Sequence, residues 1–179
     1  MTGRSPRPTE EGTSSERALR PLHIAVGSDR AGHAYKDALA EHLRGHPLVA
    51  SVLDVGVDSH TPTAYPPIAA AAAQLVADGT ADRALLVCHT GLGVAIAANK
   101  IAGIRAVTAH DAMSVRASVQ SNNAQVLAFG AGVIGLALAK HLVGDWLACR
   151  FDPTSPAAQK VQMITDLERP GRMASPHTP

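Results

Sequence analysis

The turn Cys88-His89-Thr90-Gly91-Leu92-Gly93 holds a thiol, a hydroxyl and two glycines within six residues. The short apolar run before it, 84–87, is typical of a buried strand, and residues 94–100 have the composition of a helix start. Backbone N–H groups at a helix N-terminus attract anions, and the same setting favours an exposed, reactive thiolate. The turn therefore offers a base and an anion cradle together, which predicts an enzyme rather than a passive binding module.

Each residue of this turn also has a plainer interpretation. Cys88 could be a small buried apolar residue, and Gly91 and Gly93 could simply form a tight turn. In the functional interpretation Cys88 is reactive, while Thr90 and the glycines direct N–H groups at a developing oxyanion. The spacing is neither that of a phosphate loop nor that of a dinucleotide fingerprint. Cys149, late in a helix and without such neighbours, is predicted to pack in the core.

Three further residues are candidates for ligand contact. Asp29 follows the first predicted strand, where it could cap a turn or bind sugar hydroxyls opposite Cys88. Tyr65 precedes a proline and could be an ordinary rim residue or a lid over a pocket. Asn99 ends the helix behind Cys88, where a C-terminal cap is the alternative to a substrate contact.

Composition excludes several classes of protein. Sixteen Lys and Arg against fifteen Asp and Glu leave a net charge of +1, which gives no indication of nucleic acid or a membrane surface as partner. The nine histidines show no metal-ligand spacing, so no metal is expected, and His89 and His110 are the two with site-like neighbours. Two cysteines indicate no disulfide framework and fit a reducing cytoplasm. No stretch is long and apolar enough to cross a membrane.

The hydrophobic pattern predicts strands that alternate with helices. Strands are expected at 23–27, 49–55, 84–88, 105–109 and 125–129, and helices at 34–43, 66–77, 93–100, 111–119, 134–148 and 157–168. This alternation predicts a three-layer α/β, Rossmann-like (flavodoxin-like) domain with a five-stranded parallel sheet and helices on both faces. The domain is expected over 21–168, between disordered tails at 1–20 and 169–179.

The expected topology brings two glycine-containing turns together. In a flavodoxin-like order, the switch point lies between the first and third strands. The turns at 27–32 and 88–93 follow those two strands. Sequence pattern and topology therefore predict the same crevice, with Asp29 facing Cys88 across it.

Several motifs match one known family in order along the chain. They are Gly27-Ser28-Asp29-Arg30-Ala31-Gly32, Tyr65-Pro66, the run 88–93 with Ile96-Ala97-Ala98-Asn99-Lys100 behind it, Gly103-Ile104-Arg105-Ala106, and Asn122-Asn123-Ala124-Gln125-Val126. Together they resemble the type B ribose-5-phosphate isomerase family, which includes the galactose-6-phosphate isomerase subunits. The likeness covers nearly all of residues 23–168.

The resemblance implies an aldose–ketose isomerase that uses no metal and no organic cofactor. It implies a homodimer, often paired into tetramers, with the site at the subunit interface. Cys88 would be the base that moves a proton between C1 and C2 through a cis-enediolate, stabilised by Thr90 and the N–H groups of 91–93. Asp29, Tyr65 and Asn122 would contact the sugar.

Departures from the family pattern bear on the substrate. Arg30 stands where ribose-phosphate members carry a histidine, and Ser121 where they carry the histidine thought to open the sugar ring. Gly132 and the segment 152–156 replace phosphate-binding arginines, whereas Lys160 lies near the position of a remaining basic residue.

A missing ring-opening histidine suggests a substrate with no ring to open, such as a four-carbon sugar phosphate. The segments 121–125 and 151–153 resemble the tetrulose-phosphate branch of the family. The predicted reaction is therefore the interconversion of D-erythrulose 4-phosphate and D-erythrose 4-phosphate. Arg30 and Lys160 are candidate phosphate contacts.

Three alternatives remain open. The substrate could be ribose 5-phosphate, or an allose or galactose 6-phosphate. The chain could be one part of a hetero-oligomer that divides the site between different subunits. It could also be a non-catalytic sugar-phosphate binder, or Cys88 a redox sensor, although Cys88 lacks a resolving partner.

Overall fold

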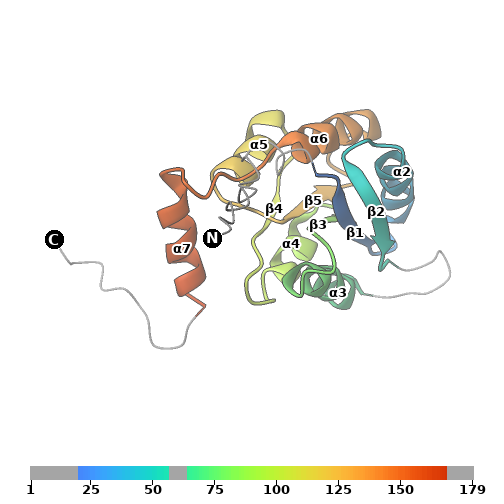
Figure 1. Ribbon diagram of the computed structural model, residues 1–179. Helices are drawn as coiled ribbons and strands as arrows, with labels where there is room; N and C mark the ends of the chain where they lie inside the picture. Colours follow the sequence, from blue (N-terminus) through green and yellow to red (C-terminus); the bar gives the residue numbers. More distant parts are fainter. Residues whose placement is uncertain (1–19, 57–63, 169–179) are drawn as a thin grey trace, which may run out of the picture.

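The computed structural model describes residues 20–56 and 64–168, and within these ranges the chain forms one parallel five-stranded sheet (Figure 1). The strands are β1 (Leu22–Ser28), β2 (Val49–Asp54), β3 (Arg83–Cys88), β4 (Ala106–Thr108) and β5 (Val126–Gly130). Their order is β2-β1-β3-β5-β4, so the α/β class and the switch between β1 and β3 are confirmed. The last two strands are exchanged relative to a flavodoxin-like order, because β5 pairs with β3 and leaves the short β4 at the edge.

Helices cover both faces of the sheet, as predicted (Figure 1). In the described residues they are α2 (His33–Arg44), α3 (Tyr65–Ala77), α4 (Leu92–Ala98), α5 (Ala112–Gln120), α6 (Leu136–Ala148) and α7 (Ala157–Asp166). Leu85 and Val87 face the core beneath α2, α5 and α6, whereas Leu86 and Cys88 face the core beneath α3 and α4. Alternate residues of β3 thus supply two cores, as expected for a central strand.

The two cores are built from side chains of different size. Trp146 and Phe129 are fully buried on the α6 side, while Ala69, Ala72 and Ala73 of α3 are fully buried on the other. Small side chains allow a helix to approach the sheet closely. Gly27 of β1 permits the same close approach, because an added Cβ there would lie 2.9 Å from Ile68 Cγ2 of α3. The thin alanine layer therefore brings the α3 and α4 backbones close to the strand ends that carry the site.

One buried arginine secures the end of α6. The Arg83 guanidinium donates hydrogen bonds to the carbonyls of Trp146 and Cys149, and lies 5.3 Å from the centre of the Trp146 ring. Burial, with a smaller contribution from Arg150, lowers the pKa of Arg83 to about 10, so it stays charged at neutral pH. It adds a charged donor to each of these carbonyls, which also accept from Cys149 N and from Arg150, respectively.

The predicted tails are only partly described. Residues 1–19 and 169–179 lie outside the described residues, so the predicted disorder there stays a prediction. Arg20, which the prediction assigned to the tail, instead bonds the carboxylate of Asp82. No helix in the described ranges has the length and apolar character needed to span a membrane.

Candidate active site

The turn after β3 holds Cys88 in a fixed position. The side chain is 5% exposed, so the expectation of an exposed thiol is wrong for a single copy of the chain. Its sulfur accepts a hydrogen bond from the backbone N–H of Gly91 at 3.1 Å. An anionic sulfur is the better acceptor for such a bond, so the turn provides a donor suited to a thiolate. Cys149, in contrast, lies in the core as predicted, where burial raises its pKa.

Gly91 is required by the shape of this turn. Its φ of 82° is left-handed, and an added Cβ would lie 2.9 Å from both Phe129 C and Thr108 Cγ2. The Thr108 hydroxyl also donates to the Gly91 carbonyl at 2.8 Å. Residues from β4 and β5 therefore hold the Cys88 turn in place, a role for Thr108 that no sequence signal indicated.

The start of α4 adds N–H groups beside this turn. The first intrahelical bond runs from Ala95 N to Gly91 O, so the N–H groups of Gly93 and Val94 precede the helical ladder. The exposed Thr90 lies at the same turn, and its hydroxyl accepts only a long contact from Leu92 N at 3.4 Å. These donors and the hydroxyl are the elements predicted for binding an oxyanion.

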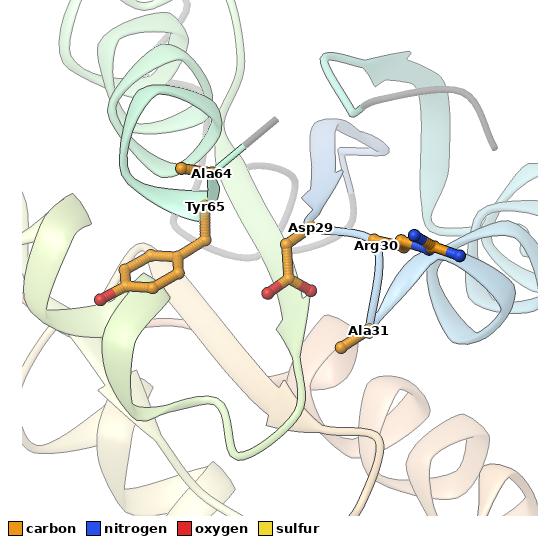
Figure 2. A pocket seen from close by; sticks show the side chains of 5 residues that line it. All are labelled: Asp29, Arg30, Ala31, Ala64 and Tyr65. Carbon is orange, nitrogen blue, oxygen red and sulfur yellow. The ribbon is translucent and has the colours of Figure 1, made fainter. Parts of the chain in front are cut away.

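A pocket of about 520 Å³ opens at the carboxyl end of β1, lined by Asp29, Arg30, Ala31, Ala64 and Tyr65 (Figure 2). One oxygen of Asp29 accepts a hydrogen bond from Gly32 N at 3.0 Å, which orients the carboxylate in its turn. Gly32 lies against the end of β3, because an added Cβ would be 2.4 Å from Val87 O. The pocket and the Cys88 turn are thus neighbours, as the predicted crevice required.

Tyr65 joins the pocket to the helix behind Cys88. Its ring lies on Gly93, where an added Cβ would be 2.7 Å from the ring. The tyrosine is 38% exposed at the start of α3, so its hydroxyl is available to a ligand. Arg30 also lines the pocket, but its guanidinium points away from Tyr65 and Asp29 (Figure 2).

Two histidines flank the turns after β3, β4 and β5. His89 is exposed, and its ring lies on Gly132, where an added Cβ would be 2.4 Å from Cε1. His110 follows β4, and its Nε2 accepts a hydrogen bond from Gly130 N at 3.0 Å. Burial lowers the pKa of His110, against the opposing effect of Asp111, and the neutral ring suits this acceptor role. Within the described ranges, no group of three or more His, Cys, Asp or Glu could hold a metal ion.

Three predicted substrate residues lie away from the crevice. The amide of Asn99 donates to Ala106 O at 2.8 Å and accepts from Ala106 N at 2.7 Å. Asn99 therefore joins α4 to β4, and its predicted substrate contact stays a prediction.

Asn122 and Lys160 are both exposed. Asn122 lies before β5, at the opposite end of the sheet, and Lys160 lies on α7. Because Cys88 pairs with Gly130, the length of β5 (about 13 Å at ~3.3 Å per residue) separates Asn122 from the Cys88 level. A single copy of the chain therefore does not bring Asn122 to the crevice, and Lys160 is not among the residues that line the pocket.

The fold and the crevice define an α/β protein whose ligand site lies at the carboxyl ends of parallel strands. The family model described as Ribose/Galactose Isomerase matches residues 24–164. D-erythrulose-4-phosphate isomerase 2 of Mycolicibacterium smegmatis is 58% identical over 82% of this chain and 97% of its own length. Ribose-5-phosphate isomerase B of Escherichia coli is 42% identical over 82% of this chain and 96% of its own.

Solved structures with a similar fold come from the same family as these relatives. The type B ribose 5-phosphate isomerase of Leishmania infantum superposes with a TM-score of 0.79 at 31% identity, covering 83% of this chain and 97% of that one. The ribose-5-phosphate isomerase B of Clostridium thermocellum gives 0.76 at 36% identity, covering 82% and 97%. The chain belongs to the ribose/galactose isomerase family, and it is a sugar-phosphate isomerase that interconverts aldoses and ketoses. The predicted family is confirmed, and the M. smegmatis relative supports its tetrulose-phosphate branch.

Proposed function

We propose that this isomerase interconverts D-erythrulose 4-phosphate and D-erythrose 4-phosphate, with Cys88 as the base. The observation that carries the base assignment is the Cys88 sulfur held by Gly91 N at 3.1 Å, beside the Asp29 and Tyr65 pocket. Relatives named for D-erythrulose-4-phosphate isomerase activity, at 58% and 39% identity, support the choice of substrate.

The reaction needs one group that removes and returns a proton. The Cys88 thiolate takes a proton from C1 of the ketose, and the C–H electron pair forms the C1=C2 bond of a cis-enediolate as the charge moves to O2. The O1 proton then passes to O2, and the thiol returns its proton to C2, which leaves an aldehyde at C1. No atom or electron is gained or lost, so no co-reactant is required.

Donors around the turn match this charge movement. The N–H groups of Gly93 and Val94, with the Thr90 hydroxyl, supply donors for the enediolate oxygens. Asp29 and Tyr65 line the pocket where hydroxyl groups of the sugar bind. Four-carbon substrates carry phosphate on the hydroxyl that would otherwise close a ring, so no ring-opening group is needed.

The complete site includes a second copy of the chain in this proposal. Asn122 lies at the amino end of the sheet and Lys160 lies on α7 outside the pocket lining, so in this proposal another copy brings them to the Cys88 turn. Leu92 and Ile96 of α4 are 58% and 62% exposed beside that turn, and α7 exposes Met163 and Leu167. Apolar surface of this kind suits a homodimer whose interface covers the crevice.

The first experiment measures turnover of both D-erythrulose 4-phosphate and ribose 5-phosphate by the purified chain. We expect the tetrulose phosphate to have the higher kcat/KM, and Cys88→Ala to lose about 10²–10⁴-fold in kcat. Cys149→Ala is the matched control. Its thiol lies in the core away from the crevice, so this substitution should leave kcat unchanged. A preference for ribose 5-phosphate would reject the substrate, and an active Cys88→Ala would reject the base.

Mixing two inactive variants tests the shared site. Cys88→Ala and Asn122→Ala chains, refolded together, should regain about a quarter of wild-type activity, because random pairing gives half heterodimers with one intact site each. Unchanged activity of Asn122→Ala alone would remove Asn122 from the site.

Both cysteines of the chain are free, which is compatible with the proposed cytoplasmic location.

A further inference from the structure

We infer that the imidazole of His89, seated on Gly132, binds the phosphate of the substrate and sets the preference for a short sugar phosphate. The inference rests on the proposed isomerase function and adds a residue for the end of the substrate where no proton is transferred. It is carried by the contact between the turns that follow β3 and β5.

The backbone ties these two turns together. Ala131 N donates to Cys88 O at 2.8 Å, and Gly132 N donates to His89 O at 2.9 Å. His89 is the residue next to the base, so the same pair of hydrogen bonds fixes its backbone relative to Cys88. A group bound to the His89 ring therefore lies close to the carbons that react at Cys88.

Gly132 decides where the ring lies. An added Cβ at this position would be 2.4 Å from Cε1, 2.8 Å from Nδ1 and 2.9 Å from Nε2 of His89. These distances are too short for any side chain other than hydrogen, so the seated ring and a side chain at position 132 exclude each other. The obstacle is a movable ring rather than backbone, so a larger residue at 132 would displace the imidazole without breaking the fold.

The ring is free to bind a ligand. In the described part of the chain neither ring nitrogen of the exposed His89 has a hydrogen-bond partner. An imidazole donates from one nitrogen when neutral and from both when protonated, which suits a phosphate oxygen. The other predicted phosphate contacts are not positioned for this role, because the Arg30 guanidinium points away from Asp29 and Tyr65, and Lys160 lies on α7, outside the pocket lining.

The strand order gives the substrate a direction. The β3 turn lies between the β1 turn, which carries Asp29, and the β5 turn, which carries Gly132. A substrate whose C1 and C2 lie at Cys88 can thus place its hydroxyls toward Asp29 and its phosphate toward His89. Since His89 directly follows the base, the distance from the reacting carbons at Cys88 to the phosphate at His89 is short. A four-carbon sugar phosphate fits this distance better than a longer one.

Steady-state kinetics on D-erythrulose 4-phosphate test the inference. His89→Ala should raise KM about 10- to 100-fold, the loss of one hydrogen bond to a charged group, with kcat changed by less than about threefold. Gly132→Ala should raise KM similarly, and the double variant should be no worse than either single one. Gly135→Ala is the matched control, because its added Cβ meets nothing within 4 Å, and it should leave KM unchanged.

Two further measurements keep the outcomes distinct. Inorganic phosphate, as a competitive inhibitor and in calorimetry, should bind wild type more tightly than His89→Ala. Adding Gly132→Arg to His89→Ala should restore part of the affinity, because a guanidinium then takes the vacated space.

An unchanged KM in His89→Ala, or a fall in kcat alone, would overturn the inference while leaving the isomerase intact. A wild-type chain that binds phosphate through His89 but turns over no sugar phosphate would instead reject the proposed function.

Discussion

Gly91→Ala is the substitution whose cost the structure defines most closely. A left-handed φ of 82° costs an alanine about 1–2 kcal/mol. The added methyl group would also lie 2.9 Å from Phe129 C and from Thr108 Cγ2, and 3.2 Å from Gly130 N. Overpacking against a well-packed surface costs about 1–3 kcal/mol more. We therefore expect the free energy of unfolding to fall by about 2–5 kcal/mol.

Gly79→Ala separates the two contributions. Gly79 has nearly the same φ, 78°, but an added Cβ meets nothing within 4 Å. It should lose only the conformational part, about 1–2 kcal/mol. Urea unfolding of both variants, with the m-value unchanged, gives the difference directly. Equal losses in the two variants would refute the assignment of close packing to the Cys88 turn.

The same substitution has a second readout in activity. Gly91 N is the donor to the Cys88 sulfur, so a methyl group that moves this backbone also disturbs the base. Under conditions where both variants are folded, Gly91→Ala should lose kcat while Gly79→Ala keeps it. A fully active Gly91→Ala would show that the N–H contact to sulfur has no part in turnover.

Three other predictions concern residues that do not contact the proposed base, Cys88. Asn99→Ala should lower the free energy of unfolding by about 1–3 kcal/mol, because two hydrogen bonds to Ala106 are lost, and it should leave KM unchanged. A raised KM would show that Asn99 contacts the substrate. Arg83→Met should cost about 2–4 kcal/mol in chemical denaturation, because the Trp146 and Cys149 carbonyls each lose a charged donor and keep only Cys149 N and Arg150; a neutral result would mean that these remaining donors are sufficient. Because the pKa of His110 is lowered in the fold, its stabilisation is complete above the ordinary value of 6.5 and is lost as the pH falls toward the folded pKa. Unfolding curves from pH 7.5 to 5 should show this slope reduced in His110→Gln, with a remainder from His46, whose pKa is lowered as well.

The sequence was sufficient to predict the elements and the crevice, since both depend on local patterns. Periodicity and turn residues placed every strand and helix to within a few residues, because alternating apolar runs and glycine turns act over short distances. The switch point followed from the flavodoxin-like strand order expected of a small five-stranded domain rather than from any single residue.

The exchange of β4 and β5 was harder to predict because sheet order depends on competition between strands. β5 is buried along its whole length, whereas Val107 and Thr108 of β4 are only partly buried. A run apolar on both faces favours the centre of a parallel sheet, and this difference was the available signal. The burial of Cys88 was missed for a related reason, because it packs in a core built by α3, α4 and β5, which lie apart in the sequence.

The parallel sheet also explains why motif order alone could not place every site residue. Each strand in such a sheet ends at one edge, and each helix carries the chain back to the other. Asp29, Cys88 and Gly132 follow strands, so one copy brings them together, whereas Asn122 follows a helix and Lys160 lies on α7 after another. In the proposed homodimer, residues of these two groups meet across a pair of chains. A reaction that needs both groups therefore depends on assembly, while the proton transfer assigned to Cys88 depends on one turn of one chain.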